Sequence, residues 1–131
     1  MITLAIALGG ALGSVARYWL STIFDSRLGA GFPWGTFWVN VTGCVVIGFA
    51  ASLTLPDGRA WGSVESRQFL ITGFCGGYTT FSTFSLQTLT LLKEGDWMQA
   101  FAYILGSVVL CLFGIWLGQT AATLVNQTSA G

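Results

Sequence analysis

Charged residues are scarce in this chain of 131 residues: 8% of its residues are charged, against about 25% in an ordinary globular domain. Histidine is absent, so the chain lacks the commonest metal ligand and the side chain that changes charge near neutral pH. The three cysteines are odd in number and show no metal-binding spacing, and we interpret them as small apolar packing residues. The sequence also shows no nucleophile–base pair and no phosphate loop. We therefore expect neither an enzyme nor a nucleic-acid partner.

The few charges are clustered, and they separate four charge-free runs at residues 1–16, 28–56, 68–92 and 97–131. A helix needs roughly 20 apolar residues to cross the hydrocarbon core of a bilayer. The first run reaches that length if Arg17 extends its side chain to the interface. A cleavable signal peptide is disfavoured there, because no Lys or Arg precedes the apolar run. We predict an all-α integral membrane protein whose residues 1–131 form one four-helix domain, with transmembrane helices at about 2–24, 33–55, 65–92 and 97–125.

The third run contains an unusual polar segment. Gly76 and Gly77 are followed by five hydroxyl side chains interleaved with two phenylalanines, over residues 79–85. Glycine leaves helical dihedrals easily, and backbone freed inside a bilayer must find partners or line a cavity. We therefore predict that the third helix is broken at the midplane near Gly76. Helix ends at such a break can hold ions without formal charge: carbonyls near Gly76 and Thr79 suit a cation, and donors beyond Thr80 suit an anion.

No acidic residue lies inside any predicted span, which argues against a proton-coupled transporter, since these typically use a carboxylate relay. The donors that remain in the spans are neutral. Asn40 brings an amide, and Tyr103 and Ser107 share one face of the last helix, a row that Cys111 continues. Hydroxyl and amide groups can replace water around a small anion. Each also has an ordinary alternative, because hydroxyls bond their own helix backbone and a lone Asn can join helices.

Aromatic and glycine spacing adds two further predictions. Phe81 and Phe84 lie three residues apart and share one helix face, and a phenyl ring has a positive edge that can meet an anion. Small residues four apart, at Gly9 and Gly13 and in a 114–118 pair, predict close helix–helix approach. The tail at 126–131 is expected to fray.

The distribution of Lys and Arg gives almost no preferred orientation in the membrane. Arg17, Arg27 and Lys93 belong to one side of the predicted topology, and Arg59 and Arg67 to the other. The excess of Lys and Arg sets which side stays inside, and three against two is nearly balanced. We expect insertion in both orientations and pairing of each chain with an inverted copy.

Three motifs, in order, resemble those of the CrcB/Fluc fluoride channels over essentially the whole chain. They are Gly9-Gly10-x-x-Gly13-x-x-x-Arg17-Tyr18, then Trp34-Gly35-Thr36-x-x-Val39-Asn40, then Gly73-Phe74-x-Gly76 continuing into Thr79-Thr80-Phe81-Ser82-Thr83-Phe84-Ser85. The resemblance implies an antiparallel dual-topology homodimer with two pores. It also implies a structural sodium ion at the dimer centre, held by the backbone carbonyls of Gly76 and Thr79.

The pore residues expected on this basis are Asn40, Thr80, Phe81, Thr83, Phe84, Ser85, Tyr103 and Ser107. Two positions depart from the family pattern: Cys111 stands where a second hydroxyl is common, and Gln87 where glutamate is common. We predict a passive fluoride-selective channel of the bacterial inner membrane that exports fluoride and confers fluoride resistance. The alternatives are a small dual-topology multidrug-type transporter, disfavoured by the missing intramembrane acid, and a non-conducting membrane subunit.

Overall fold

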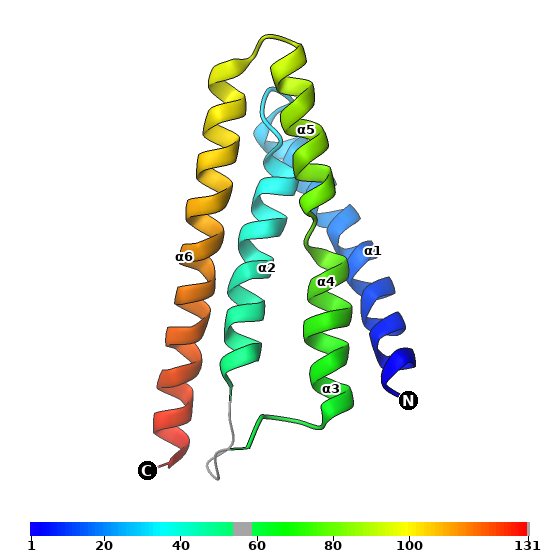
Figure 1. The fold of residues 1–131 in the computed structure, drawn as a ribbon, viewed down its shortest axis with the longest axis vertical. Coiled ribbons are helices and arrows are strands. Elements are labelled where there is room, and N and C mark those ends of the chain that lie inside the picture. Colours follow the sequence, from blue (N-terminus) through cyan, green and yellow to red (C-terminus); the bar gives the residue numbers. More distant parts are fainter. Residues whose placement is uncertain (54–58, 131) are drawn as a thin grey trace.

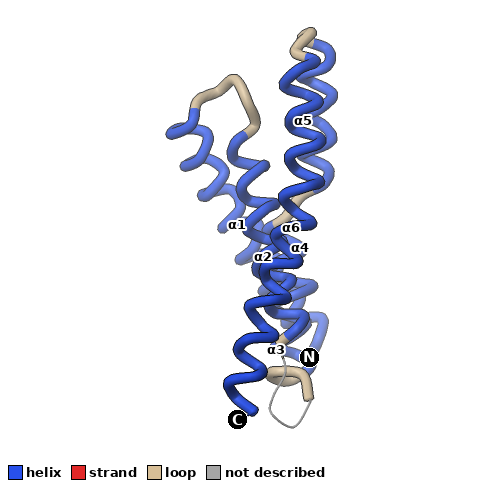
Figure 2. The backbone as a smooth tube through the Cα atoms, turned by 90° about the vertical axis from the view of Figure 1, so that its left-hand side faces the viewer, coloured by secondary structure: helices blue, strands red, loops and turns tan. Residues whose placement is uncertain are grey.

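The computed structural model describes residues 1–53 and 59–130, which form helices joined by short connections. The long helices are α1 (Ile2–Leu28), α2 (Trp34–Ser52) and α6 (Trp97–Ala130). Between α2 and α6 the chain forms α3 (Val64–Gln68), the π-helix η1 (Phe69–Cys75), α4 (Gly76–Tyr78) and α5 (Phe81–Lys93). The result is an elongated molecule with both termini at the same end (Figures 1 and 2).

Three helices are long and apolar enough to cross a membrane: Ile2–Leu28, Trp34–Ser52 and Trp97–Ser129. The predicted third span, residues 65–92, is divided among α3, η1, α4 and α5, and no single one of these has the length of a span. Ser63 caps the start of α3, because its Oγ accepts the N–H of Ser66 over 3.2 Å. The all-helical prediction is confirmed for the described residues, and three of the four predicted spans appear as continuous helices.

The first helix is longer than predicted, and it ends at Leu28 instead of residue 24. Asp25 lies in the added turn, and its Oδ1 accepts the backbone N–H of Gly35 over 2.7 Å. This bond ties the end of α1 to the first turn of α2, so the polar residues stay helical. Gly29 then stops the helix with a φ of 96°, a left-handed conformation that glycine adopts without strain.

The expectation of a frayed tail is wrong for residues 126–130, because α6 continues to Ala130. Asn126 donates its side-chain N–H to the carbonyl oxygen of Ser52 over 3.0 Å. Ser52 is the last residue of α2, where helix carbonyls lack intrahelical donors. The two helices thus hold each other at this end. Position 131 and the predicted end of the second helix at 55 lie outside the described residues.

Glycine lets the helices approach each other closely, as the spacing predicted. A methyl group added at Gly13 would collide with the backbone of Phe74 and Tyr78, and one at Gly118 with the backbone of Val45 and Phe49. Backbones in lipid gain packing contacts when small residues face each other. These contacts fix α1 against the η1–α4 segment and α6 against α2.

The irregular backbone of the third segment lies later than predicted. Gly76 and Gly77 are helical, whereas Thr79 (φ −81°, ψ 156°) and Thr80 (φ −151°, ψ 114°) are extended. A methyl group at Gly77 would collide with the backbone of Gly10. The prediction that the glycine pair interrupts the helix is therefore wrong in its position and its cause. Gly77 serves close packing against α1, and the dihedrals change three residues after Gly76.

Candidate functional site

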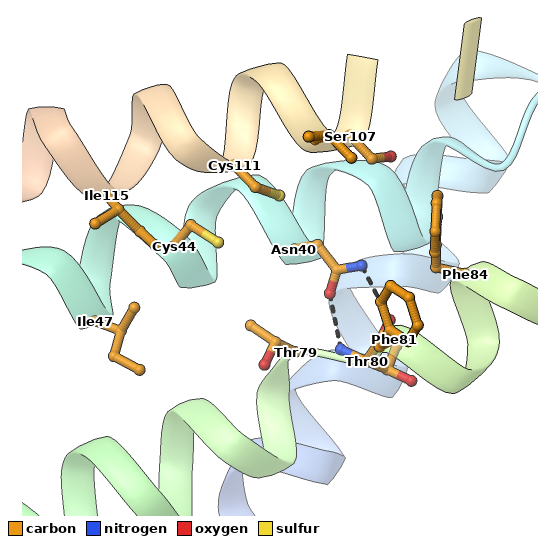
Figure 3. A pocket seen from close by; sticks show the side chains of 11 residues that line it. Asn40, Cys44, Ile47, Thr79, Thr80, Phe81, Phe84, Ser107, Cys111 and Ile115 are labelled. Carbon is orange, nitrogen blue, oxygen red and sulfur yellow. Dashed lines mark hydrogen bonds between the residues drawn. The ribbon is translucent and has the colours of Figure 1, made fainter. Parts of the chain in front are cut away.

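The extended residues between α4 and α5 are held by a side chain from α2. Asn40 donates from Nδ2 to the carbonyl oxygen of Thr80 over 3.1 Å, and its Oδ1 accepts the N–H of Thr80 over 2.8 Å (Figure 3). The side-chain hydroxyl of Thr80 then caps α5, because Oγ1 accepts the N–H of Thr83 over 3.2 Å. An amide group has two N–H donors, so one N–H of Asn40 remains beside the bond to Thr80.

These bonds leave two backbone carbonyls without their helical donors. In a continuous α-helix the Gly76 carbonyl would accept the N–H of Thr80, and the Thr79 carbonyl that of Thr83. Here both N–H groups bind side-chain oxygens instead. Gly76 is also exposed, with open space beside its Cα. The two predicted sodium ligands are thus oxygen atoms freed from the helix pattern by the arrangement at Thr80.

A pocket of about 360 Å³ lies beside the hydrogen-bonded pair of Asn40 and Thr80, between α2, α6 and the start of α5. Figure 3 shows its side chains, which are those of Asn40, Cys44, Ile47, Thr79, Thr80, Phe81, Phe84, Ser107, Val108, Cys111 and Ile115. Ser107 is 7% exposed, and its Oγ has no hydrogen-bond partner among the described residues. A buried hydroxyl without a partner loses about 1–3 kcal/mol relative to a satisfied one. The pocket therefore suits a ligand that accepts a hydrogen bond from Ser107.

A row of aromatic rings runs from this pocket to Tyr103 on α6. The ring centroids of Phe81 and Phe84 are 5.4 Å apart, and those of Phe84 and Tyr103 are 4.9 Å apart. Tyr103 is fully buried and donates its hydroxyl hydrogen to Oε1 of Gln87 over 2.8 Å. Phe81, in contrast, is 80% exposed. The two phenylalanines share a face as predicted, with the Phe84 ring half-buried against Tyr103 and the Phe81 ring exposed.

A second pocket, of about 260 Å³, contains Arg17 and several hydroxyl groups. Its walls are Ser14, Arg17, Tyr18, Ser21, Thr36, Thr80 and Thr83. The Nε of Arg17 is buried and has no hydrogen-bond partner among the described residues, and no carboxylate lines this pocket. Thr80 lines both pockets. Thr80 thus lies between the basic, hydroxyl-rich Arg17 pocket and the first pocket, which contains Asn40 and Ser107.

Comparison with known protein families gives a match over most of the chain. Residues 4–119 match the family described as "CrcB-like protein, Camphor Resistance (CrcB)". This chain belongs to that family.

Relatives of this CrcB-family chain carry a consistent name. A protein of Rhodospirillum rubrum called "Fluoride-specific ion channel FluC" is 54% identical over 127 residues, which cover 97% of this chain and 98% of the relative. Proteins of the same name from Opitutus terrae and Paramagnetospirillum magneticum are 54% and 49% identical, covering 95% and 97% of this chain and 94% and 100% of the relatives. The family is one of ion channels and not of enzymes. Together with the three apolar helices, this makes the chain an integral membrane protein.

The structure brings together five of the eight residues predicted for the pore of this CrcB-family protein: Asn40, Thr80, Phe81, Phe84 and Ser107 line the first pocket. Thr83 lines the Arg17 pocket instead. Tyr103 lies behind Phe84, and Ser85 donates to the carbonyl oxygen of Phe81 over 2.9 Å and lines neither pocket. Whether these residues conduct an ion stays a prediction.

Sequence reasoning missed part of both pockets. Thr36 is 4% exposed and lines the Arg17 pocket, and Cys44 lines the first pocket. Cys44 is four residues after Asn40, so helical spacing places it on the same face, a signal that could have been used. The position of Thr36 beside Arg17 depends on how α1 packs on α2, which no local pattern shows.

Proposed function

We propose that this chain forms a passive fluoride-selective ion channel. The observation that carries the proposal is the first pocket, where the buried Ser107 hydroxyl has no hydrogen-bond partner among the described residues and the free N–H of Asn40 and two phenyl rings are close by. The names of the relatives support the choice of fluoride. Fluoride is small and strongly hydrated, so it enters an apolar region only where other donors replace its water.

The two pockets support a path from Arg17 to Ser107. Arg17 attracts the anion into a space lined by hydroxyls, and Thr80 lines both that space and the next one. In the next pocket the available groups are neutral: an amide N–H, a serine hydroxyl and ring edges. Conduction needs sites that bind well enough to admit the ion and weakly enough to release it. Neutral donors in series meet that condition, because a second fixed cation would hold the ion.

Passive conduction is sufficient for fluoride export. Hydrogen fluoride crosses membranes as a neutral weak acid and ionises in a less acidic cytoplasm. A negative membrane potential then drives the anion outward through a channel. The multidrug-type transporter is disfavoured because no Asp or Glu lies within the four apolar runs. Ser107 Oγ and Arg17 Nε are buried without a hydrogen-bond partner in the part of the chain that the structure describes. This disfavours a non-conducting subunit, because buried polar groups in a purely structural protein are normally hydrogen-bonded.

The working unit that we propose is an antiparallel dual-topology homodimer in the inner membrane of a bacterium. In this dimer, residues 64–93 also cross the membrane, between the spans of α2 and α6, so each chain crosses four times. The irregular backbone at Thr79 and Thr80 lies near the midplane. The near balance of Lys and Arg supports insertion both ways up. Phe81 and Gly76 are exposed in the single chain, so an inverted partner on this face would complete the path and cover the polar segment.

A structural sodium ion fits the freed carbonyl oxygens of Gly76 and Thr79. Hard cations take carbonyl oxygen as a ligand, and both carbonyls lack their helical donors. Two such pairs would meet where two inverted copies join. The bound ion would supply positive charge that fixes the two irregular segments against each other. It is static in this proposal and does not move with fluoride.

An efflux assay tests the function directly. Purified protein in liposomes loaded with fluoride or chloride is monitored with ion-selective electrodes after a potassium ionophore sets the potential. Rapid fluoride release without chloride release is expected. Release of both anions, or of neither, would reject the fluoride channel.

A further inference from the structure

Two cysteines from different helices meet in the wall of the first pocket. Cys44 lies on α2, one turn after Asn40, and Cys111 lies on α6, one turn after Ser107. Both line the pocket, and Figure 3 draws both side chains in its wall. Their thiol groups lie within hydrogen-bonding reach of each other. Both are free thiols. A methyl group at Gly114 would lie 3.1 Å from the carbonyl oxygen of Val41 and 3.5 Å from Cβ of Cys44, so glycine on α6 lets α2 approach at this level.

The chemistry of two thiols without other ligands restricts what can bind. Thiolates prefer soft cations such as Cu(I). Zinc takes four protein ligands in a structural site, and the described residues contain no group of three or more His, Cys, Asp or Glu that could hold a metal. Soft monovalent ions with a filled d shell accept two thiolates in a line. We propose that Cys44 and Cys111 form a two-coordinate binding site for a soft monovalent cation of the Cu(I) and Ag(I) class.

Binding changes the charge of the pocket. Each S–H bond breaks as a metal–sulfur bond forms, and two protons leave to solvent, because metal ligation requires the thiolate form. Two thiolates and one monovalent cation carry a net charge of minus one. That charge lies in the same pocket as Asn40 and Ser107, where it repels an anion. The bound cation therefore closes the path, a consequence that rests on the proposed function, whereas the binding itself does not.

The first test measures binding without conduction. The purified protein is treated with silver nitrate in chloride-free buffer and desalted, and bound silver is counted by elemental mass spectrometry. One ion per chain with two sulfur neighbours in its X-ray absorption spectrum is expected. Cys44→Ala and Cys111→Ala should each weaken retention by at least about 100-fold, more than the loss of an outer-shell partner costs. Cys75→Ala is the matched control and should bind as the parent does, because Cys75 does not line the pocket.

The second test measures fluoride efflux with and without silver, each variant being compared with itself. Silver fluoride is soluble, so the metal does not remove the transported ion. Silver should inhibit the parent and Cys75→Ala but not the other two variants, and zinc nitrate should have no effect. Three results of the binding test would overturn the proposal. They are silver bound at a different site, a single sulfur neighbour in the absorption spectrum, and unchanged silver retention in Cys44→Ala and Cys111→Ala. A parent that binds silver as expected but never conducts would reject the channel and leave the metal site standing.

Discussion

The side-chain amide of Asn40 holds the backbone of Thr80 at two points, donating to its carbonyl oxygen over 3.1 Å and accepting its N–H over 2.8 Å. This pairing connects helix α2 to the irregular residues between α4 and α5. It diverts the Thr80 N–H from the helix pattern and positions Thr80 in the walls of both pockets. One side chain thus shapes both the candidate anion path and the candidate cation ligands.

Replacing Asn40 with aspartate should block fluoride efflux. The variant has no N–H to give to the Thr80 carbonyl, and it places a negative charge beside the path. A like charge at 4 Å costs about 4 kcal/mol at an effective dielectric constant of about 20, which corresponds to roughly a 1000-fold slower passage. Asn126→Asp makes the same change at the end of α6 and should conduct normally. Parent-rate efflux from a folded Asn40→Asp dimer would mean that Asn40 only joins helices.

Isoleucine in place of Phe81 or Phe84 should slow fluoride efflux while the dimer stays intact on gel filtration. The replacement keeps an apolar side chain but removes the positive ring edge. A loss of about 1.4 kcal/mol at the barrier corresponds to about a tenfold lower rate. Phe113→Ile, on an exposed part of α6, is the control and should have the parent rate. If both pocket variants also conducted at that rate, the rings would be ordinary packing.

Alanine at Gly77 should destabilise the fold, whereas alanine at Gly10 should not. The added methyl at Gly77 collides with the backbone of Gly10, but one at Gly10 makes only an ordinary 3.9 Å contact with the carbonyl oxygen of Gly73. Overpacking costs about 1–3 kcal/mol. Thermal unfolding in detergent compares the two variants. Equal midpoints would show that α1 and α4 shift apart without cost.

Reporter cysteines should reveal both orientations in the membrane. Ala60, shortly before α3, and Glu94, directly after α5, are exposed. The start of α3 and the turn between α5 and α6 lie at opposite ends of the molecule (Figure 1). In a dual-topology protein, Ala60→Cys and Glu94→Cys each react with an impermeant maleimide from both sides, and the parent chain corrects for native thiols. Labelling of each position from one side only would contradict insertion in both orientations.

The freed carbonyls should hold a monovalent cation in the dimer. Crystals grown with sodium are expected to show density between the Gly76 and Thr79 oxygen atoms of the two copies. Transport assays with labelled sodium are expected to show no movement of sodium with fluoride. Exchange of sodium for a large organic cation should lower the unfolding temperature of the dimer. A closed apolar contact in the map, with stability independent of the cation, would exclude the ion.

Composition and spacing predicted the larger features of this protein. Ten charges at the edges of apolar runs indicated a membrane protein, and three of those runs are span-length helices. Gly13 and Gly118 were identified from spacing alone, and the structure places both at close helix contacts. These features are local: burial in lipid depends on the run of side chains itself, and a helix face follows from a fixed number of residues per turn. The family resemblance implied that Asn40, Phe84 and Ser107 belong to one pore, and the structure places them around one pocket.

Only the tertiary structure decided where the third segment leaves the helix and which groups lack partners. Local propensity pointed to Gly76 and Gly77, but those residues are helical, and the change occurs at Thr79 and Thr80. The cause is the hydrogen bond that the Thr80 N–H donates to Oδ1 of Asn40, forty residues earlier in the chain. Glycine only permits an irregular backbone, whereas a distant acceptor for the Thr80 N–H stabilises one. Such a bond exists only once the helices are packed, so no local pattern in the sequence could locate it.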